Sequence, residues 1–375
     1  TIENAVLFDG VADYLQRTPG SAGNRKTWTA SAWVKQSAIT PKSTIIGAGT
    51  SLSDSGEFIV KFNDTADGDQ ITAQTGSTVP TVTSAVYRDP TAWQHVVYSC
   101  DTTLASNQFT LTVNGVVVTA LSTDNDLTRY TDTAMMNNVV HEIGRFPRVT
   151  GQYFNGYMAD VHFIDGAALA ATAFGEFDDN GVWVPIEYDD TTAIVTHVPG
   201  SEGSVIGDMT ANQGLAEAYD GVTSGDTNAA SAIVSTTGYN GKDWGSGVTK
   251  TLEYVQIHGT TNYGYVYSTN PSVTVTVQGS TDNFSSSIVD LGNVTFTDTG
   301  NESAARYITG LTTTTAYRYH RCKIVAGSGT HTYFVEIKFF EQSTGYGTNG
   351  YHLDFAVAPG TGSGAGTDVN GSALT

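Results

Sequence analysis

The stretch Y-F-N-G-Y-M-A-D-V-H-F-I-D-G, residues 153–166, decides the fold that we predict for this chain. From residue 157 to residue 164 the side chains alternate between two faces of a strand. One face carries Tyr157, Ala159, Val161 and Phe163, and the other carries Met158, Asp160, His162 and Ile164. This period of two is typical of a β-strand in a sandwich. Asp165-Gly166 predicts a turn after it, so we expect the stretch to close one β-domain.

Residues 167–174, directly after this turn, are the best helix candidate in the chain. A segment of about eight residues makes one or two helical turns, which is short for an independently stable helix. The rest of the sequence favours sheet, because 41 Gly and 19 Tyr accompany abundant Thr, Ser and Val. With 375 residues, the chain is long enough for two or three domains. We therefore predict an all-β protein.

Short strand candidates recur on the N-terminal side of the opening stretch, separated by Gly, Asp and Asn. They are residues 6–8, 28–35, 44–47, 57–63, 70–74, 93–101 and 109–118. The last candidate contains Asn114-Gly115 between two apolar runs. This dipeptide predicts a tight hairpin, because both residues tolerate positive φ. Regularly spaced strands of this kind predict an antiparallel sandwich.

The charge balance excludes some partners. The chain has 17 Lys and Arg against 37 Asp and Glu, a formal net charge of −20, so it would repel nucleic-acid phosphates and anionic membranes. The sequence has neither a run of about 18 apolar residues nor a signal-peptide pattern. We expect no nucleic-acid binding and no membrane insertion. Its two cysteines, Cys100 and Cys322, predict free buried thiols.

Several segments of the first half carry a family resemblance. They are F-D-G (8–10), W-T-A-S-A-W-V-K (28–35), D-P-T-A-W-Q-H-V-V (89–97), L-T-V-N-G (111–115), I-G-R (143–145) and the stretch 153–166. In this order they resemble the concanavalin A-like or laminin-G-like jelly rolls, above all those in virion proteins of tailed, marine-type phages. The resemblance implies a jelly-roll sandwich over residues 1–188.

The second half resembles another family. Residues 189–204 are poor in aromatics and contain P-G-S-E-G, which predicts a linker. The segments after it are A-Y-D-G-V-T-S-G-D-T (218–227), L-E-Y-V-Q-I-H-G (252–259), V-T-V-T-V-Q-G-S-T-D-N-F (273–284), Y-R-Y-H-R-C-K-I (317–324) and Y-F-V-E-I-K-F-F (333–340). They resemble a discoidin or coagulation-factor C-type domain, which implies a galactose-binding-like jelly roll over residues 205–342. The expected architecture is two antiparallel jelly-roll β-sandwiches.

The C-terminal region predicts an insertion. In the phage proteins that the first half resembles, a W-x-P-x-x-Y segment runs almost directly into a Y-G-T-N-G-Y-x-L-x-F segment. Here residues 183–188 match the first segment and residues 346–355 match the second, with the discoidin-like domain between them. The resemblance implies that this domain is inserted into the first and that residues 343–358 return to it. Residues 359–375 predict a Gly-rich tail.

The discoidin resemblance also implies a structural Ca²⁺. Such domains often hold one ion through an Asp in an A-x-D-G turn, Thr or backbone oxygens after it, and a Glu of the last strand. The matching residues are Asp220, Asp226 or Thr227, and Glu336. Asn228-Ala229 stand where the family usually has a Trp, which departs from the pattern. The alternative is that Asp220-Gly221 is only a turn and Glu336 only a solvated strand residue.

Sugar binding on either fold would use loop aromatics for stacking, with nearby polar groups that hold hydroxyls. The candidates are Tyr263, Tyr265 and Tyr267, in a loop after a strand, with Trp244 nearby in sequence. The alternative is that these tyrosines, spaced by two, line one face of a strand and pack in a core or interface.

Catalytic patterns are incomplete. Glu176-Phe177-Asp178 begins the E-x-D-x-x-E pattern of β-glucanases, but residue 181 is Gly. His141-Glu142 begins H-E-x-x-H, but residue 145 is Arg. Two further groups are expected to have no functional role. We predict that the strand histidines His95, His162 and His258 are structural rather than bases or ligands, and that Asp64, Asp67 and Asp69 are solvated turn carboxylates rather than a metal site.

The sequence thus predicts a non-enzymatic virion protein of a tailed phage, such as a tail-fibre, spike or capsid-surface component, that binds host or environmental glycans for adhesion. We expect assembly in the host cytoplasm and location on the virion surface. The expected partners are host-surface glycans, other virion proteins and further copies of the chain in a homo-oligomer. One alternative is a purely structural decoration protein, and another is a polysaccharide depolymerase, which the incomplete carboxylate pair disfavours.

Overall fold

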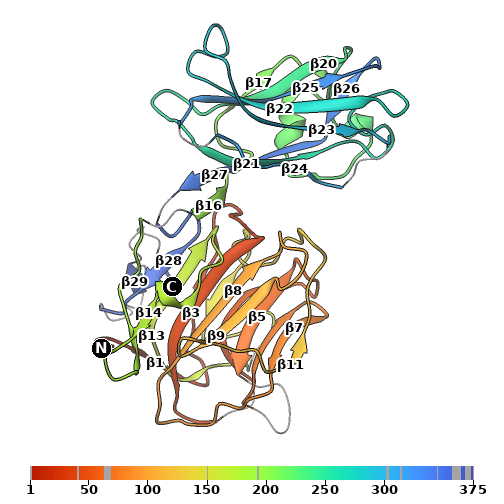
Figure 1. Cartoon of the computed structure of the whole chain (residues 1–375). Helices are drawn as coiled ribbons and strands as arrows, with labels where there is room; N and C mark the ends of the chain where they lie inside the picture. Colours follow the sequence, from red (N-terminus) through yellow and green to blue (C-terminus); the bar gives the residue numbers. More distant parts are fainter. Residues whose placement is uncertain are drawn as a thin grey trace. The chain divides into compact units, whose positions relative to one another are not determined.

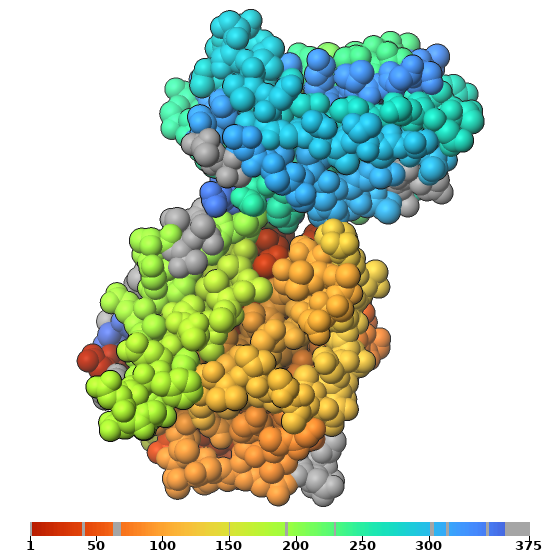
Figure 2. Space-filling model, viewed as in Figure 1, coloured from red at the N-terminus to blue at the C-terminus, as the bar shows by residue number. Residues whose placement is uncertain are grey.

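The computed structural model divides the chain into two compact units. Unit 1 comprises residues 1–194 and 344–375, and unit 2 comprises residues 195–343. The structure describes residues 2–39, 42–62, 69–149, 151–191, 194–300, 304–312, 315–343, 345–356, 365–367 and 373–374. Within these ranges all regular structure is strand or short 3-10 helix, which confirms the all-β prediction. Figure 2 shows the surface of each unit, coloured along the sequence.

None of the described helices is both long and apolar enough to cross a membrane.

The first sheet of unit 1 is built around β3 and β13 (Figure 1). Its order is β1 (Val6–Asp9), β13 (Asn155–Asp165), β3 (Thr27–Gln36), β8 (Gln94–Asp101), β9 (Phe109–Val113) and β10 (Val116–Val117), with β28 (Tyr351–Leu353) also paired to β13. Asn114 and Gly115 have φ of 48° and 76° between β9 and β10. The predicted tight hairpin is therefore confirmed.

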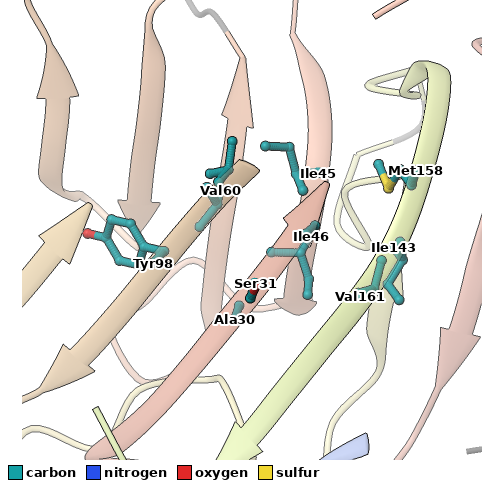
Figure 3. Close-up of a pocket in the computed structure, with 11 residues that line it drawn as sticks. Ala30, Ser31, Ile45, Ile46, Val60, Tyr98, Ile143, Met158 and Val161 are labelled. Carbon is teal, nitrogen blue, oxygen red and sulfur yellow. The ribbon is translucent and has the colours of Figure 1, made fainter. Parts of the chain in front are cut away.

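The second sheet of unit 1 packs on the first. Its order is β11 (Leu121–Asp124), β7 (Thr78–Thr83), β6 (Ile71–Thr75), β5 (Glu57–Phe62), β4 (Ser43–Gly49), β12 (His141–Ile143) and β2 (Leu15–Arg17). The core lies between the sheets, where the Trp28 ring meets the Phe58 ring edge-on at 5.0 Å. Side chains of both sheets, Tyr98 of β8 and Val60 of β5 among them, line a void of about 10 Å³ there (Figure 3). Such a void holds at most one water, so it is a packing defect rather than a ligand site.

The opening stretch contains a β-bulge that the alternation did not predict. The pairing of β13 with β3 shifts register between Ala159 and His162, and Asp160 has a φ of 48°. Met158 therefore joins Val161 in the core between the sheets, while Ala159 packs on the opposite face. The predicted assignment of faces is wrong from this point, because one extra residue in a strand reverses every side chain after it.

The outer face of the first sheet is covered by the segment that follows β13. The hairpin β14 (Gly175–Phe177) and β15 (Trp183–Pro185) brings Trp183 against this face, in a cluster with Trp33 and Val97. The predicted helix over residues 167–174 is only a 3-10 turn, η1 (Ala171–Ala173), and no side chain caps its N-terminus. A single turn without a cap forms too few hydrogen bonds to offset the free-energy cost of helix nucleation.

The sheets of unit 2 enclose a separate core. One has the order β16 (Ile194–His197), β27 (Glu336–Ser343), β21 (Leu252–His258) and β24 (Arg306–Ile308). Another has the order β17 (Ser204–Gly207), β20 (Thr237–Asp243), β25 (Tyr319–Ala326), β22 (Ser272–Ser280) and β23 (Val289–Thr297). A third contains β18 (Ala211–Asn212), β19 (Ser231–Ile233) and β26 (Thr332–Phe334). Val273, Val275 and Val277 are fully buried, as the alternation of β22 predicts. Both cysteines, one in each unit, are free and buried.

The boundaries of unit 2 differ from the prediction. Residues 189–204 are not wholly a linker, because Ile194–His197 form β16, which pairs with β27, and Val198 lies in the core of unit 2. This edge strand has the sequence Ile-Val-Thr-His and contains no Phe, Tyr or Trp, so the scarcity of aromatics in the segment did not exclude it.

The segment after unit 2 belongs to unit 1. Tyr346 packs its ring 5.2 Å from that of Tyr188, and β28 pairs with β13. Asp165 is fully buried and accepts the backbone N–H groups of Asn24 at 2.7 Å and Asn349 at 2.9 Å. The contacts hold residues on both sides of unit 2 against one strand. That unit 2 arose by insertion stays a prediction. In the predicted tail, β29 (Ala365–Thr367) pairs with β30 (Ala373–Leu374), and the remaining tail residues lie outside the described ranges.

Candidate functional site

A hollow at the surface of unit 2 contains Tyr263 and Tyr267, both in the connection from β21 to β22. Their side chains are 38% and 46% exposed. The ring centroids are 4.4 Å apart and the ring planes stand at 89°. Two exposed rings at a right angle form a corner, in which one ring offers its face and the other borders the space in front of it.

The other described residues that line the hollow are polar and uncharged. They are Asn262, Ser268, Thr269, Asn270 and Thr299, together with the backbone of Gly300. Amides and hydroxyls both donate and accept hydrogen bonds. A corner of aromatic rings with such groups around it has the composition of a site for small polar ligands that also have an apolar face, sugars above all.

The carboxylate of Asp298 joins the two loops of the hollow, the loop of Tyr263 to Tyr267 and the loop of Thr299 and Gly300. Its side chain is fully buried. One carboxylate oxygen accepts the backbone N–H groups of Tyr265 at 2.7 Å and Val266 at 2.8 Å, and the other accepts that of Gly300 at 3.0 Å. Gly264 has a φ of 68°, and a Cβ there would stand 2.0 Å from Asp298 Oδ1. Only glycine therefore allows the loop to close on this carboxylate.

Two of the predicted sugar-binding residues do not reach this hollow. Tyr265 is fully buried and donates its hydroxyl to the Ile257 carbonyl at 3.0 Å. Trp244 is also buried and donates Nε1–H to Nδ1 of His320 at 2.8 Å. The prediction is wrong for both, because a ring enclosed by the core has no face to offer to a sugar. The i, i+2, i+4 spacing failed because the segment turns at Gly264 and does not continue as a strand.

The predicted Ca²⁺ ligands meet only in part. Glu336 is buried at the start of β27, and its carboxylate accepts the N–H of Gly221 at 3.2 Å. Burial raises the pKa of Glu336 to about 8. The neighbouring cation, Lys242, donates Nζ to the Gly200 carbonyl at 2.6 Å, and burial lowers its pKa to about 8. A buried carboxylate beside the Asp220-Gly221 turn fits a cation there.

The remaining predicted ligands have other partners. Asp226 caps the 3-10 turn η3 (Thr227–Ala229) by accepting the N–H of Asn228 at 2.8 Å. The Thr227 carbonyl accepts a hydrogen bond from Asn212 at 2.5 Å. Among the described residues, the carboxylates of Asp220, Asp226 and Glu336 do not gather into one group. The residues thus fit a Ca²⁺ at Glu336 and the Asp220 turn, without direct help from the Asp226 side chain.

The acidic loop of unit 1 is described only at its end. Asp64 and Asp67 lie outside the described residues. Asp69 is buried and pairs with Arg88 at 2.8 Å, so its carboxylate is not the solvated turn residue that we predicted.

One cluster of possible metal ligands escaped the sequence analysis. Asp160 Oδ1 lies 3.1 Å from His162 Nε2 and 2.6 Å from His352 Nε2. The two histidines are cross-strand partners in β13 and β28. Although burial opposes it, hydrogen bonds from both rings hold the pKa of Asp160 well below its usual range. The bulge at Asp160 and the register of β28 create this cluster, and neither can be read from local alternation.

The ring geometry of this cluster suits hydrogen bonding better than metal ligation. The imidazoles of His162 and His352 are stacked at 4.0 Å with only 7° between their planes. A ligated metal lies near the plane of each ring, and two parallel planes share no such point. Nδ1 of His162 is buried without a hydrogen-bond partner, whereas a ligating histidine donates its second N–H. Asp160 therefore serves as the shared acceptor of two N–H groups.

A serine and a histidine in unit 1 resemble a catalytic pair by distance alone. Ser31 Oγ lies 2.7 Å from His95 Nε2. Trp183 donates Nε1–H to His95 Nδ1 at 2.9 Å, so the ring proton must be on Nε2 and points at the serine. Burial lowers the pKa of His95 to about 3. A neutral ring with this tautomer cannot take a proton from Ser31, so the pair is structural, as predicted for His95.

The family comparison concerns unit 1. Residues 9–172 match the model of the concanavalin A-like lectin/glucanases superfamily. No curated protein sequence matches the chain.

Solved structures of low identity are similar to parts of the chain. The family 32 CBM of NanJ from C. perfringens, in complex with galactose, is 12% identical, with 40% of this chain and 100% of that chain covered and a TM-score of 0.31. A fucose-binding module from Streptococcus pneumoniae is 15% identical, with 38% and 96% covered and a TM-score of 0.28. The SAP-like pentraxin of Limulus polyphemus is 15% identical, with 44% and 77% covered and a TM-score of 0.36.

Proposed function

We propose that this chain is a non-enzymatic carbohydrate-binding protein and that unit 2 holds the sugar in the hollow of Tyr263 and Tyr267. The observation that carries the proposal is the pair of exposed rings at 4.4 Å, bordered by uncharged amides and hydroxyls. Exposed apolar groups that lie together and are bordered by polar residues often mark a ligand-binding site. A sugar offers C–H groups to a ring face and hydroxyls to the polar rim, which matches both halves of the hollow.

We further propose that the protein acts on the virion surface of a tailed phage, as a tail-fibre, spike or capsid-surface component for adhesion. The motifs of residues 1–188 that resemble phage virion proteins support this role, and so does the match of residues 9–172 to a lectin-containing superfamily. Host-surface glycans, other virion proteins and further copies of the chain are the proposed partners. A structural Ca²⁺ at Glu336 is part of the proposal, because its buried carboxylate lies against the Gly221 N–H of the Asp220-Gly221 turn and both offer oxygen ligands.

A purely structural decoration role has one observation in its favour. The β9–β10 and β14–β15 hairpins expose Val116, Val117, Phe177 and Val182. The hairpins meet at Trp183, which packs 4.9 Å from the Phe177 ring and directly over Gly115. Such a group of apolar side chains suits a contact with another virion protein.

A glycan array and a host-cell binding assay, each with and without Ca²⁺, test the proposed function. We expect binding that the Tyr263→Ala, Tyr267→Ala double variant loses. The matched control is Tyr157→Ala, which removes a tyrosine that is 40% exposed in unit 1. The decoration role would replace adhesion if no glycan or cell binds under either condition and a particle map shows Tyr263 and Tyr267 buried against a neighbouring chain.

A further inference from the structure

We propose that the hollow of Tyr263 and Tyr267 binds the unsubstituted terminal sugar of a neutral glycan. It would prefer this sugar to acidic glycans and to sugars in the interior of a glycan chain. This inference rests on the proposed function and adds the class of ligand. Two independent features carry it, the charge around the hollow and the angle between its rings.

The charge around the hollow disfavours acidic sugars. Among the described residues, no lysine, arginine or histidine lines it. Uronic and sialic acids carry a carboxylate that proteins usually bind through Arg or Lys. The buried carboxylate of Asp298 instead holds Tyr265, Val266 and Gly300 by their N–H groups. The His331 ring lies 6.2 Å from the Tyr267 ring but does not line the hollow. An anionic ligand would therefore find no Lys or Arg among the described lining residues and would enter the field of a chain with a net charge of −20.

The polar groups of the hollow suit hydroxyls. The side chains of Asn262 and Asn270 carry amides, and those of Ser268, Thr269 and Thr299 carry hydroxyl groups, of which that of Ser268 also lies 3.1 Å from the Ser328 hydroxyl. Each of these groups can both donate and accept, as a sugar hydroxyl can. A neutral sugar therefore replaces its hydrogen bonds to water without leaving a charge unpaired.

The angle between the rings disfavours the interior of a glycan chain, which would have to continue past the hollow on both sides of the bound sugar. Extended binding of successive sugars needs aromatic faces that lie along one line, so that each face stacks on one sugar. Tyr263 and Tyr267 stand at 89°, so only one of them can lie flat against a given sugar face. The second ring then borders the edge of the same sugar. The loop residues 268–270 and Thr299 border the remaining space, so the corner accommodates one sugar at a chain end.

The test is isothermal titration of the full chain with matched sugars. The first series pairs neutral and acid-bearing ligands that share a core: lactose with 3′-sialyllactose, and galactobiose with digalacturonic acid. We expect the best neutral ligand to bind at least tenfold more tightly than its acidic counterpart, with an affinity that changes less than twofold between 50 and 500 mM NaCl. Tyr267→Ala should abolish this binding, and Tyr157→Ala should leave it unchanged.

The second series varies the length of the best neutral ligand from two to eight sugars at equal chain concentration. Binding at an end predicts one protein per chain and an affinity constant within twofold along the series. An affinity that grows with length would overturn the chain-end assignment. Equal or tighter Tyr267-dependent binding of the acidic sugars would overturn the neutral class but leave the proposed function intact. Failure of every ligand in both series and on the array would overturn the proposed function as well.

Discussion

Asp298→Asn tests whether the buried carboxylate of Asp298, which does not line the hollow, holds its loops in place. The carboxylate accepts three backbone N–H groups at 2.7, 2.8 and 3.0 Å. An asparagine has one acceptor oxygen and one donor NH₂ group, so at least one N–H group must face another donor. The bonds that remain also lose the charge of the acceptor.

A hydrogen bond to a charged group contributes about 1.5–3 kcal/mol. Loss of one such bond and weakening of the others should cost local stability of about 2–4 kcal/mol. An opening free energy that falls by about 2 kcal/mol raises the rate of amide hydrogen exchange roughly 30-fold. Because Tyr265 and Val266 share one oxygen, one orientation of the asparagine leaves Gly300 unpaired and the opposite orientation leaves Tyr265 and Val266 unpaired. We expect the increase at whichever of these N–H groups faces the NH₂ group, with a matching loss of sugar affinity.

Hydrogen exchange followed by mass spectrometry of peptides that cover residues 259–271 and of peptides that cover Gly300 measures the effect. The control is Asp290→Asn, because Asp290 is exposed in β23 and asparagine can still accept from Gln278. Exchange that stays within twofold of the parent protein both in the 259–271 peptides and in the peptides that cover Gly300 would refute the role of Asp298.

Three further predictions concern unit 2 and the clusters of unit 1. Burial raises the folded pKa of Glu336 to about 8 from an ordinary 4.5. With a chelator present, the free energy of unfolding should therefore fall as pH rises from about 4.5 to about 8, by at most about 5 kcal/mol. Urea unfolding at pH 5 and pH 8 checks this, and a pH dependence of stability that Glu336→Gln does not reduce would disprove it. Gly264→Ala should cost more than about 2 kcal/mol, since φ is 68° and its Cβ would meet Asp298; an unchanged urea midpoint would contradict the packing. His352→Ala should leave Zn²⁺ binding in equilibrium dialysis unchanged, whereas a stoichiometric Zn²⁺ lost in this variant would show that the stacked rings open to ligate a metal.

The sequence predicted the strands of the first sandwich well, because their alternation and turns are local. Asn114-Gly115 formed its hairpin with both φ angles positive. The bulge at Asp160 is different, since an extra residue leaves the local pattern almost unchanged. It nevertheless reversed the faces of the strand and placed a carboxylate beside two histidines.

The sequence pointed to the tyrosines of the candidate site by their residue type, but only their burial in the structure shows which of them are accessible. Tyr263 and Tyr267 lie at the surface, but Tyr265 between them enters the core because the loop turns over Asp298. The spacing of the tyrosines cannot predict that turn, because it depends on Gly264 and on a carboxylate more than thirty residues further along the chain. His352 was missed for the same reason, since its partners are set by the register of β28 on β13.

The most direct test of the account is a crystal structure of the full chain with the best neutral sugar from the titrations. We predict one sugar in the corner of Tyr263 and Tyr267, with its face against one ring and its hydroxyls on the amides and hydroxyls that border the hollow. A sugar bound in unit 1 instead, with the hollow of Tyr263 and Tyr267 filled by water, would contradict the central claim.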